Sequence, residues 1–199
     1  MPYSSFTLTE VLDKFELKIN EQQDLFVGVA PRMPSDFLRA WLAENAPLAL
    51  ALSTEKARSE FLIAPILAEV RTLLERRVSL FSGIDFTVDA AQGLNGECDF
   101  LFSKSPEQLL LRAPVVSVVE AKNESFKNGI AQAGAEMVAA HIFNERKNQP
   151  LERVYGAVTT GDAWQFLKLE QQVLFVDKRR YDLDNLPEIL GIICHMLTA

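Results

Sequence analysis

The sequence has few of the residues that build soft metal sites and disulfide frameworks. Its 199 residues include two cysteines, Cys98 and Cys194, and two histidines, His141 and His195. The cysteines lie far apart and have no C-x-x-C spacing, which argues against a zinc or redox site and fits a reducing compartment. We expect both to be plain core residues. Any metal in this protein would therefore be held by oxygen atoms, which favours Mg²⁺ or Mn²⁺.

Long apolar runs and an excess of positive charge are also missing. No apolar run approaches the roughly 18 residues that span a bilayer, and the start, MPYSSFTLTE, lacks the basic and apolar regions of a signal peptide. The sequence therefore predicts a cytoplasmic protein with no membrane segment. The formal net charge of -7 weakens the case for a constitutive nucleic-acid binder, because such binding depends on Lys and Arg. It does not exclude an enzyme whose basic residues are local.

What is present is the composition of an ordinary globular protein. Hydrophobic residues make up 48% of the chain and charged residues 24%, and this length supports one good core. We therefore expect a single domain over residues 1–199. Within it we expect an N-terminal extension packed on the core (1–52), a main core (53–182) and a C-terminal helix (183–199).

The hydrophobic pattern predicts the order of the elements. Helical spacing and capping residues predict helices over residues 7–17, 34–52, 53–77, 124–148 and 184–198. Alternation and β-forming residues predict strands over 24–31, 79–90, within 92–103 and over 109–122, with two or three more in 152–182. Pro65 is placed to kink the third helix, and Phe37 and Trp41 are predicted to be packing residues. The order indicates an α/β protein.

Three Glu-x-Lys tripeptides occur in the chain, at Glu16–Lys18, Glu120–Lys122 and Glu145–Lys147, so the tripeptide alone carries no information. The second one differs in its setting, because it ends a Val-rich strand that follows an Asp-bearing strand. A charged pair at the end of a buried strand needs a partner, since an unpaired buried charge is costly. We therefore take this tripeptide as the candidate site.

Alternation along a strand places Glu120 and Lys122 on one face and Ala121 on the other. If the strand that carries Asp99 pairs beside this one, two carboxylates and an ammonium group converge. Asp99, Glu120 and the carbonyl of Ala121 would then suit an oxygen-liganded Mg²⁺. Lys122 would orient the nucleophile or stabilise negative charge on a phosphate. A structural cluster of ion pairs is the alternative interpretation.

These residues resemble the PD-(D/E)XK nuclease superfamily, which has the restriction-endonuclease-like fold. The resemblance covers roughly residues 54–182 and includes Asp99, the triplet Glu120-Ala121-Lys122, and Gln132, which sits where some branches carry a glutamine near the metal. Cys98 stands where the name of the motif has proline, a position that is loose across the superfamily. The resemblance implies an αβββαβ core, a central mixed sheet flanked by helices, and Mg²⁺-dependent cleavage of phosphodiester bonds.

Several other residues are secondary candidates. Glu60, with Glu55 behind it, is the expected additional carboxylate on the leading helix, because family members often carry one there. A solvated helix face explains either residue equally well. Arg58 is expected to be an ordinary surface cation. The basic run 178–180, together with Lys127, could contact backbone phosphates, although a solvated strand end explains it more simply.

The sequence thus predicts a Mg²⁺- or Mn²⁺-dependent nuclease that acts on nucleic acid, with DNA the expected substrate. The alternative is a catalytically inactive protein of the same fold that serves as a binding or scaffolding module. A homodimer would give a duplex-cutting enzyme two active sites, and homodimers are the commonest oligomers.

Overall fold

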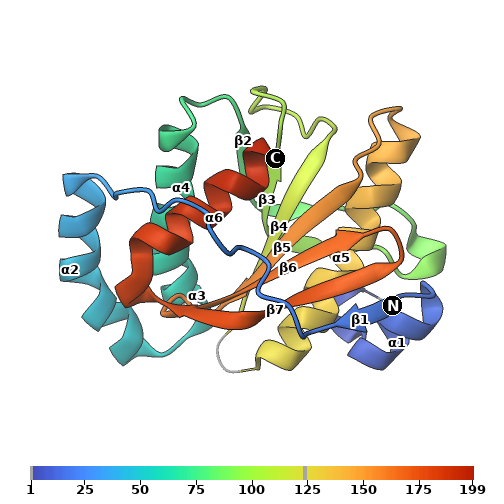
Figure 1. Cartoon of the computed structure of the whole chain (residues 1–199), viewed down its shortest axis with the longest axis horizontal. Helices are drawn as coiled ribbons and strands as arrows, with labels where there is room; N and C mark the ends of the chain where they lie inside the picture. The colour runs from blue at the N-terminus through green and yellow to red at the C-terminus, as the bar shows by residue number, and fades with distance from the viewer. Residues whose placement is uncertain (1, 123–124) are drawn as a thin grey trace.

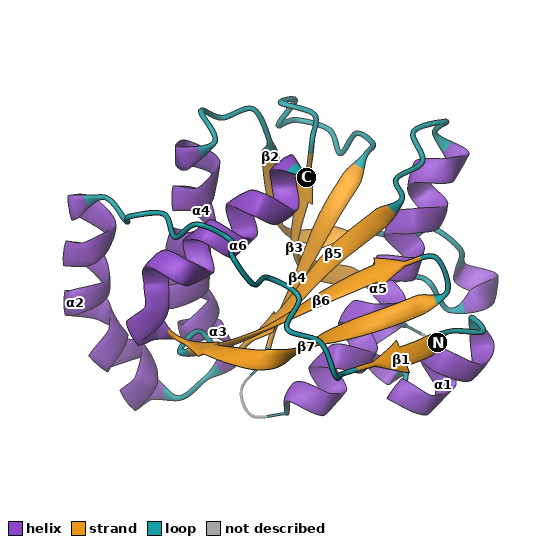
Figure 2. Ribbon diagram, in the orientation of Figure 1, coloured by secondary structure: helices purple, strands orange, loops and turns teal. Residues whose placement is uncertain are grey.

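The chain forms one seven-stranded mixed sheet with helices packed on both of its faces (Figures 1 and 2). A computed structural model describes residues 2–122 and 125–199. The strand order is β1-β7-β6-β5-β4-β3-β2. The strands are β1 (Lys18–Asn20), β2 (Ser79–Asp85), β3 (Glu97–Ser103), β4 (Val115–Ala121), β5 (Arg153–Thr159), β6 (Ala163–Glu170) and β7 (Val173–Asp182).

The helices divide the core into two hydrophobic clusters, one on each side of the sheet. One cluster lies under α1 and α5, and the other lies under α2, α4 and α6. Figure 1 shows α6 crossing one face while α5 runs along the opposite one. The helices are α1 (Leu8–Lys14), α2 (Asp36–Leu52), α3 (Glu55–Arg58), α4 (Ala64–Leu73), α5 (Phe126–Arg146) and α6 (Leu186–Thr198).

The direction in which neighbouring strands run decides which strand ends lie side by side. β2, β3 and β4 pair antiparallel in chain order, and α5 then crosses over so that β5 pairs parallel with β4. From α3 onward the order is helix, three strands, helix, strand, as the sequence predicts. The predicted α/β class with a mixed sheet flanked by helices is confirmed, whereas the restriction-endonuclease-like core remains a prediction.

The N-terminal region belongs to the same sheet and the same core. Thr7 and Glu10 form a reciprocal capping box that starts α1, and β1 adds a parallel edge strand beside β7. The predicted strand over 24–31 is wrong. Gly28 has φ of 80° and the amide of Val29 donates to the carbonyl of Phe26 at 3.2 Å, so this segment turns instead of extending.

The helix predicted over 53–77 is interrupted by a π-helical turn, Ser59–Ile63, directly before Pro65. Proline has no N–H to donate to the carbonyl four residues earlier, which is that of Phe61. The indole Nε1 of Trp41, on α2, donates to this carbonyl at 3.0 Å. The interruption thus gives α2 a polar contact with the leading helix, and Trp41 packs there as predicted.

Two other strands are shorter than predicted. β2 ends at Asp85, whose carboxylate accepts a hydrogen bond from the amide of Thr87 at 3.2 Å and starts a turn. β4 begins at Val115, after Pro114, which cannot donate to a strand ladder. Along the outer edge of the sheet, the amide side chain of Gln108 donates to the carbonyl of Leu80 at 2.6 Å and accepts from its N–H at 3.3 Å.

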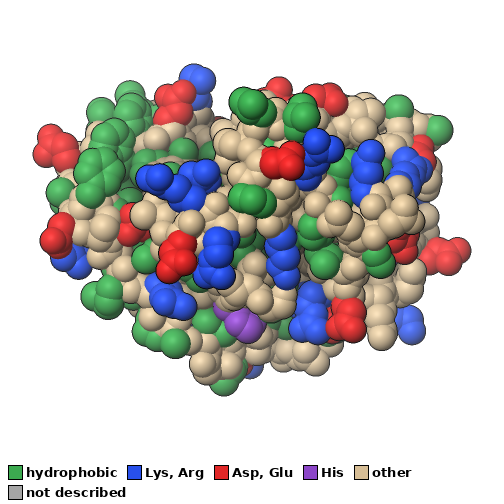
Figure 3. Space-filling model, turned by 90° about the horizontal axis from the view of Figure 1, so that it is seen from above, with side chains coloured by type: hydrophobic (Ala, Val, Ile, Leu, Met, Phe, Trp, Pro, Cys, Tyr) green, Lys and Arg blue, Asp and Glu red, His purple; other side chains and the backbone are tan. Residues whose placement is uncertain are grey.

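The outward side of α2 carries several exposed apolar residues beside the charged residues Asp36, Arg39 and Glu44. Phe37 is 73% exposed, so its predicted packing role is wrong, and Leu48 and Leu52 are also exposed. Figure 3 shows hydrophobic side chains gathered at the end of the molecule where α2 lies, while basic and acidic side chains are interspersed over the rest of that face. Within the described part of the chain, no helix combines the length and apolarity needed to cross a membrane.

Candidate active site

The predicted residues meet at one end of the sheet because β3 and β4 run antiparallel. The start of β3 therefore lies beside the end of β4, and the last registered pair toward this end is Phe100 with Val119. Beyond it, Asp99 Oδ2 accepts a hydrogen bond from the backbone amide of Ala121 at 2.8 Å. The Asp99 carboxylate is thus fixed against the last residue of β4, as the hairpin predicts.

An acidic cavity of about 300 Å³ opens at this point. Asp99 and Ala121 line it from the sheet, and α3 with the π-helical turn lines the other side. The lining residues are Glu55, Lys56, Ser59, Glu60, Ser82, Gly83, Glu97, Asp99 and Ala121. The structure therefore brings Glu60, the predicted additional carboxylate, and Glu55 to the same cavity as Asp99.

Local capping explains how α3 presents these acids. The Thr54 side chain accepts from the amide of Ala57 at 3.1 Å and begins the helix, so Glu55 stands in its first turn. Glu60 forms an exposed ion pair with Lys56 at 3.0 Å, an interaction that contributes little to stability. The carboxylates of this cavity are consequently only partly neutralised.

Glu120 lies beside the cavity and does not line it. Its side chain is 1% exposed, and its Oε1 forms an ion pair with Lys122 Nζ. Glu120 Oε2 is buried and has no hydrogen-bond partner among the described residues. Burial, followed by the nearby carboxyl groups of Glu136 and Asp99, raises the pKa of Glu120, while Lys122 opposes this shift.

Lys122 keeps its charge despite partial burial. Burial alone would lower the pKa of its ammonium group, but the neighbouring carboxylates of Glu120, Glu55 and Asp99 outweigh it and raise the pKa. The predicted convergence of Asp99, Glu120 and Lys122 is thus present in space. The open groove that would expose both carboxylates to a substrate is not, because Glu120 is turned inward toward α5.

Glu136 is a site residue that the sequence pattern did not single out. It lies on α5, is completely buried, and stands close enough to the Glu120 carboxyl group to raise the pKa of that group. Gln132, one helical turn earlier, donates to Glu136 Oε1 at 3.2 Å. Burial raises the pKa of Glu136 to about 8. The signal that could have found it is a glutamate four residues after Gln132 within a run of Ala and Gly, where a helix face packs closely.

Gln132 therefore contacts Glu136 and does not line the acidic cavity. It is buried, and its described hydrogen bond goes to Glu136. Burial, followed by the nearby carboxyl groups of Glu136 and Glu120, raises the pKa of the Cys98 thiol, and Cys98 is a buried core residue as predicted. Three buried polar side chains thus lie on the α5 side of the sheet near Glu120, namely Gln132, Glu136 and Cys98.

The donor atoms suit a hard divalent cation, because carboxylate and carbonyl oxygens are the ligands of Mg²⁺. The unpartnered Oε2 of Glu120 beside the Asp99 carboxylate is also what an absent cation would leave. Over residues 2–122 and 125–199, however, no three His, Cys, Asp or Glu side chains are grouped closely enough to hold a metal ion. The types of donor atom thus suit a hard divalent cation. Glu120, however, does not line the cavity with the other carboxylates, so the side chains do not form a grouped set of ligands.

A neighbouring network corrects the prediction for Arg58. Its side chain is only 12% exposed and forms an ion pair with Asp162 at 2.6 Å. The same guanidinium donates to the carbonyl of Thr160 at 2.7 Å. Arg58 therefore ties the leading helix to the turn between β5 and β6, and it is not an ordinary surface cation.

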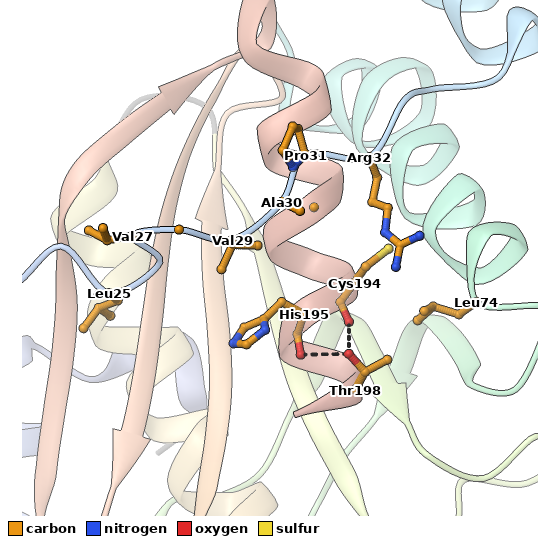
Figure 4. Close-up of a pocket in the computed structure, with 12 residues that line it drawn as sticks. Leu25, Val27, Val29, Ala30, Pro31, Arg32, Leu74, Cys194, His195 and Thr198 are labelled. Carbon is orange, nitrogen blue, oxygen red and sulfur yellow. Dashed lines mark hydrogen bonds between the residues drawn. The ribbon is translucent and has the colours of Figure 1, made fainter.

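A larger cavity of about 560 Å³ lies where residues 25–32 cross α6 (Figure 4). Its polar lining includes Arg32, Cys194, His195 and Thr198, and no Asp or Glu stands among its described lining residues. It therefore lacks the anionic oxygens that a hard cation needs. The smaller acidic cavity is the better candidate, because the titratable groups meet there.

Comparison with known proteins adds no relative. No protein-family model matches this chain, and neither does any curated protein or solved structure. The resemblance to PD-(D/E)XK nucleases accordingly rests on Asp99, the Glu120-Ala121-Lys122 triplet and the order of the elements around them.

Proposed function

We propose that this protein is a Mg²⁺- or Mn²⁺-dependent nuclease of the PD-(D/E)XK type that hydrolyses phosphodiester bonds of nucleic acid, with DNA the expected substrate. The observation that carries the proposal is the convergence of Asp99, Glu120 and Lys122 at one end of the sheet, where Asp99 lines an acidic cavity and Glu120 and Lys122 lie beside it. Among the described residues, the four acidic side chains of the cavity and Glu120 outnumber the two lysines, Lys56 and Lys122, that pair with them. A divalent cation would offset that charge and give the cavity affinity for a phosphate, which the carboxylates alone would repel.

Each residue has a distinct part in this proposal. Asp99, Glu120 and the carbonyl of Ala121 would hold the cation, which supplies a Lewis acid and lowers the pKa of a bound water. Lys122 would offset charge that develops on the phosphate. Glu60 would help to hold a second metal or a water at the far wall of the cavity.

A catalytically inactive scaffold or binding module of the same fold is the second candidate. The observation that favours it is the burial of Glu120, which is paired to Lys122 and turned toward α5. A charge cluster of this kind can persist for structural reasons, since removing one partner of a buried pair is strongly destabilising.

The deciding experiment measures cleavage of labelled single- and double-stranded DNA and RNA with Mg²⁺, with Mn²⁺ and with EDTA. Glu120→Gln keeps the shape of the side chain, and Lys122→Met keeps the carbon chain that packs near Gly129. We expect each substitution to lower the cleavage rate by about 100-fold or more. Glu145→Gln, in an exposed Glu-x-Lys tripeptide on α5, is the matched control and should cleave normally.

Far-UV circular dichroism checks that each variant is folded. If the wild-type protein cleaves none of these substrates and calorimetry detects no Mg²⁺ or Mn²⁺ binding, the inactive module is the correct function. Equal cleavage by wild type and Glu120→Gln would also exclude the proposed site.

A further inference from the structure

One row of residues crosses the sheet from the candidate site to β7. Glu120 on β4 is directly opposite Val158 on β5, Val158 is opposite Gln165 on β6, and Gln165 is opposite Arg180 on β7. Residues directly opposite one another in a sheet project from the same face. Arg180 therefore lies on the α5 side of the sheet, in the row that contains Glu120.

The guanidinium of Arg180 is held in place. Its Nε donates to Gln165 Oε1 at 2.7 Å, and its Cζ lies 4.5 Å from the centre of the ring of Phe126, the first residue of α5. Gln165 is only 5% exposed, and its own amide nitrogen donates to the backbone carbonyl of Asp177. A buried amide and an aromatic face thus orient an exposed cation.

Arg180 forms no ion pair within the described part of the chain. Across residues 2–122 and 125–199, no Asp or Glu lies within ion-pair distance of Arg180. Its neighbour Arg179 differs, because it pairs with Glu188 at 2.9 Å and lies over the ring of Tyr181. In a chain of net charge -7, an exposed arginine that is oriented by its neighbours and has no ion pair among the described residues suits an anionic ligand.

We propose that Arg180 binds a backbone phosphate of the nucleic acid a few nucleotides away from the bond cut at Asp99, Glu120 and Lys122. Three strand spacings of about 4.8 Å separate β4 from β7, so the two points are roughly 14 Å apart. A rigid, planar guanidinium with free donors matches a phosphate. This inference rests on the proposed function and selects one residue from the basic run 178–180.

The experiment measures binding of fluorescein-labelled single- and double-stranded DNA by anisotropy, in Mg²⁺ and over a series of salt concentrations. Glu120→Gln serves as the parent, so that no cleavage occurs during the measurement. Arg180→Ala in this parent should weaken binding about tenfold, the size of a lost hydrogen bond to a charged group. It should also reduce the slope of log affinity against log salt by about 0.7 to 0.9. Arg179→Ala is the matched control and should change neither value.

A second measurement separates binding from catalysis. In the otherwise native chain, Arg180→Ala should raise KM, while the single-turnover rate at saturating DNA stays within about twofold of wild type. If cleavage occurs but Arg180→Ala binds DNA with unchanged affinity and salt slope, or Arg179→Ala weakens binding equally, the inference is wrong and the nuclease stands. If neither the Glu120→Gln parent nor the wild-type protein binds DNA, both the proposed nuclease function and the role of Arg180 are wrong.

Discussion

Two glutamates meet in the interior with a single lysine between them and the surface. Glu120 pairs with Lys122 and lies near Glu136, and both glutamates have an Oε2 atom without a partner among the described residues. Two ionised carboxylates in contact repel strongly when they are buried, so one proton is retained. Burial raises the pKa of both carboxyl groups, that of Glu136 to about 8, so the pair holds this proton at neutral pH.

The buried acid makes stability depend on pH. Glu136 binds a proton with a pKa of about 8 in the folded protein and 4.5 in the unfolded chain. Between these values the folded state holds more protons, so the free energy of unfolding should fall as pH rises from about 5 to 8. Glu136→Gln retains a donor and cannot ionise, so its urea midpoint should fall less over this range. Glu145→Gln changes an exposed residue of the same helix, so its urea midpoint should fall with pH as the wild-type midpoint does. If the midpoint of Glu136→Gln falls as far as that of wild type, this explanation is wrong.

At the scale of single residues, the sequence pattern predicts where the candidate site residues lie in the fold, but it does not predict which way the side chain of Glu120 points. Asp99, Lys122 and Glu60 were predictable because strand ends, hairpins and helix starts place them by local geometry. The burial of Glu120 was not predictable, because it depends on α5, which the crossover between β4 and β5 brings over this face of the sheet. Arg58 was misjudged for a similar reason, since its partner Asp162 lies 104 positions away in the chain.

At the scale of helices and strands, the candidate site depends on how closely α5 packs against the sheet. A Cβ atom at Gly129 would lie 2.4 Å from Val158 Cγ1 and 3.0 Å from Lys122 Cγ, whereas one at Gly134 would meet nothing nearer than 3.4 Å, at Leu174. The two glycines lie on one helix but differ in the space around them. Gly129 is required for the helix to pack beside Lys122.

This difference predicts opposite effects of two similar substitutions. Gly129→Ala forces α5 away from β5, and we expect it to lower the free energy of unfolding by about 1–3 kcal/mol. Gly134→Ala makes only ordinary contacts and gains helix propensity, so it should raise stability by about 0.5–1 kcal/mol. Urea denaturation followed by circular dichroism gives both values. A stable Gly129→Ala protein with wild-type cleavage would show that the close approach is not needed.

The elements themselves were largely predictable from periodicity and caps. The helix that became α5 and the strand that became β4 were identified because each has a long, consistent pattern. The segment 24–31 was assigned as a strand because its apolar residues are typical of one, but the positive φ of Gly28 and packing against the rest of the chain produce a turn. Short apolar runs depend on tertiary contacts that a local pattern does not contain.

At the scale of the whole molecule, the N-terminal 52 residues and the remainder share one core. Tyr3, Phe6 and Val11 belong to the cluster under α5, and Phe26 and Leu38 belong to the cluster under α6. Tyr3 also donates from its hydroxyl to the carbonyl of Phe86 at 2.5 Å. This region is therefore integrated into the fold and does not form a separate layer.

The two tryptophans allow a direct test of that integration. Trp41 lies in the N-terminal region, and Trp164 is fully buried in the sheet. In the single-tryptophan proteins Trp41→Phe and Trp164→Phe, the fluorescence transition in urea should coincide with the far-UV transition of the same protein. Comparison within each variant removes the effect of the substitution on stability. A fluorescence transition from Trp41 that precedes loss of the sheet would mean that the N-terminal region unfolds independently.

The hydrogen bonds of Gln108 with Leu80 have a consequence for behaviour at high concentration. An exposed outer strand is a template on which another chain can add its own strand, and such addition starts aggregation. Here one side chain already occupies both the donor and the acceptor of a residue in β2. The loop that carries Gln108 thus blocks the addition of a further strand at Leu80, on the same strand whose residues Ser82 and Gly83 line the acidic cavity.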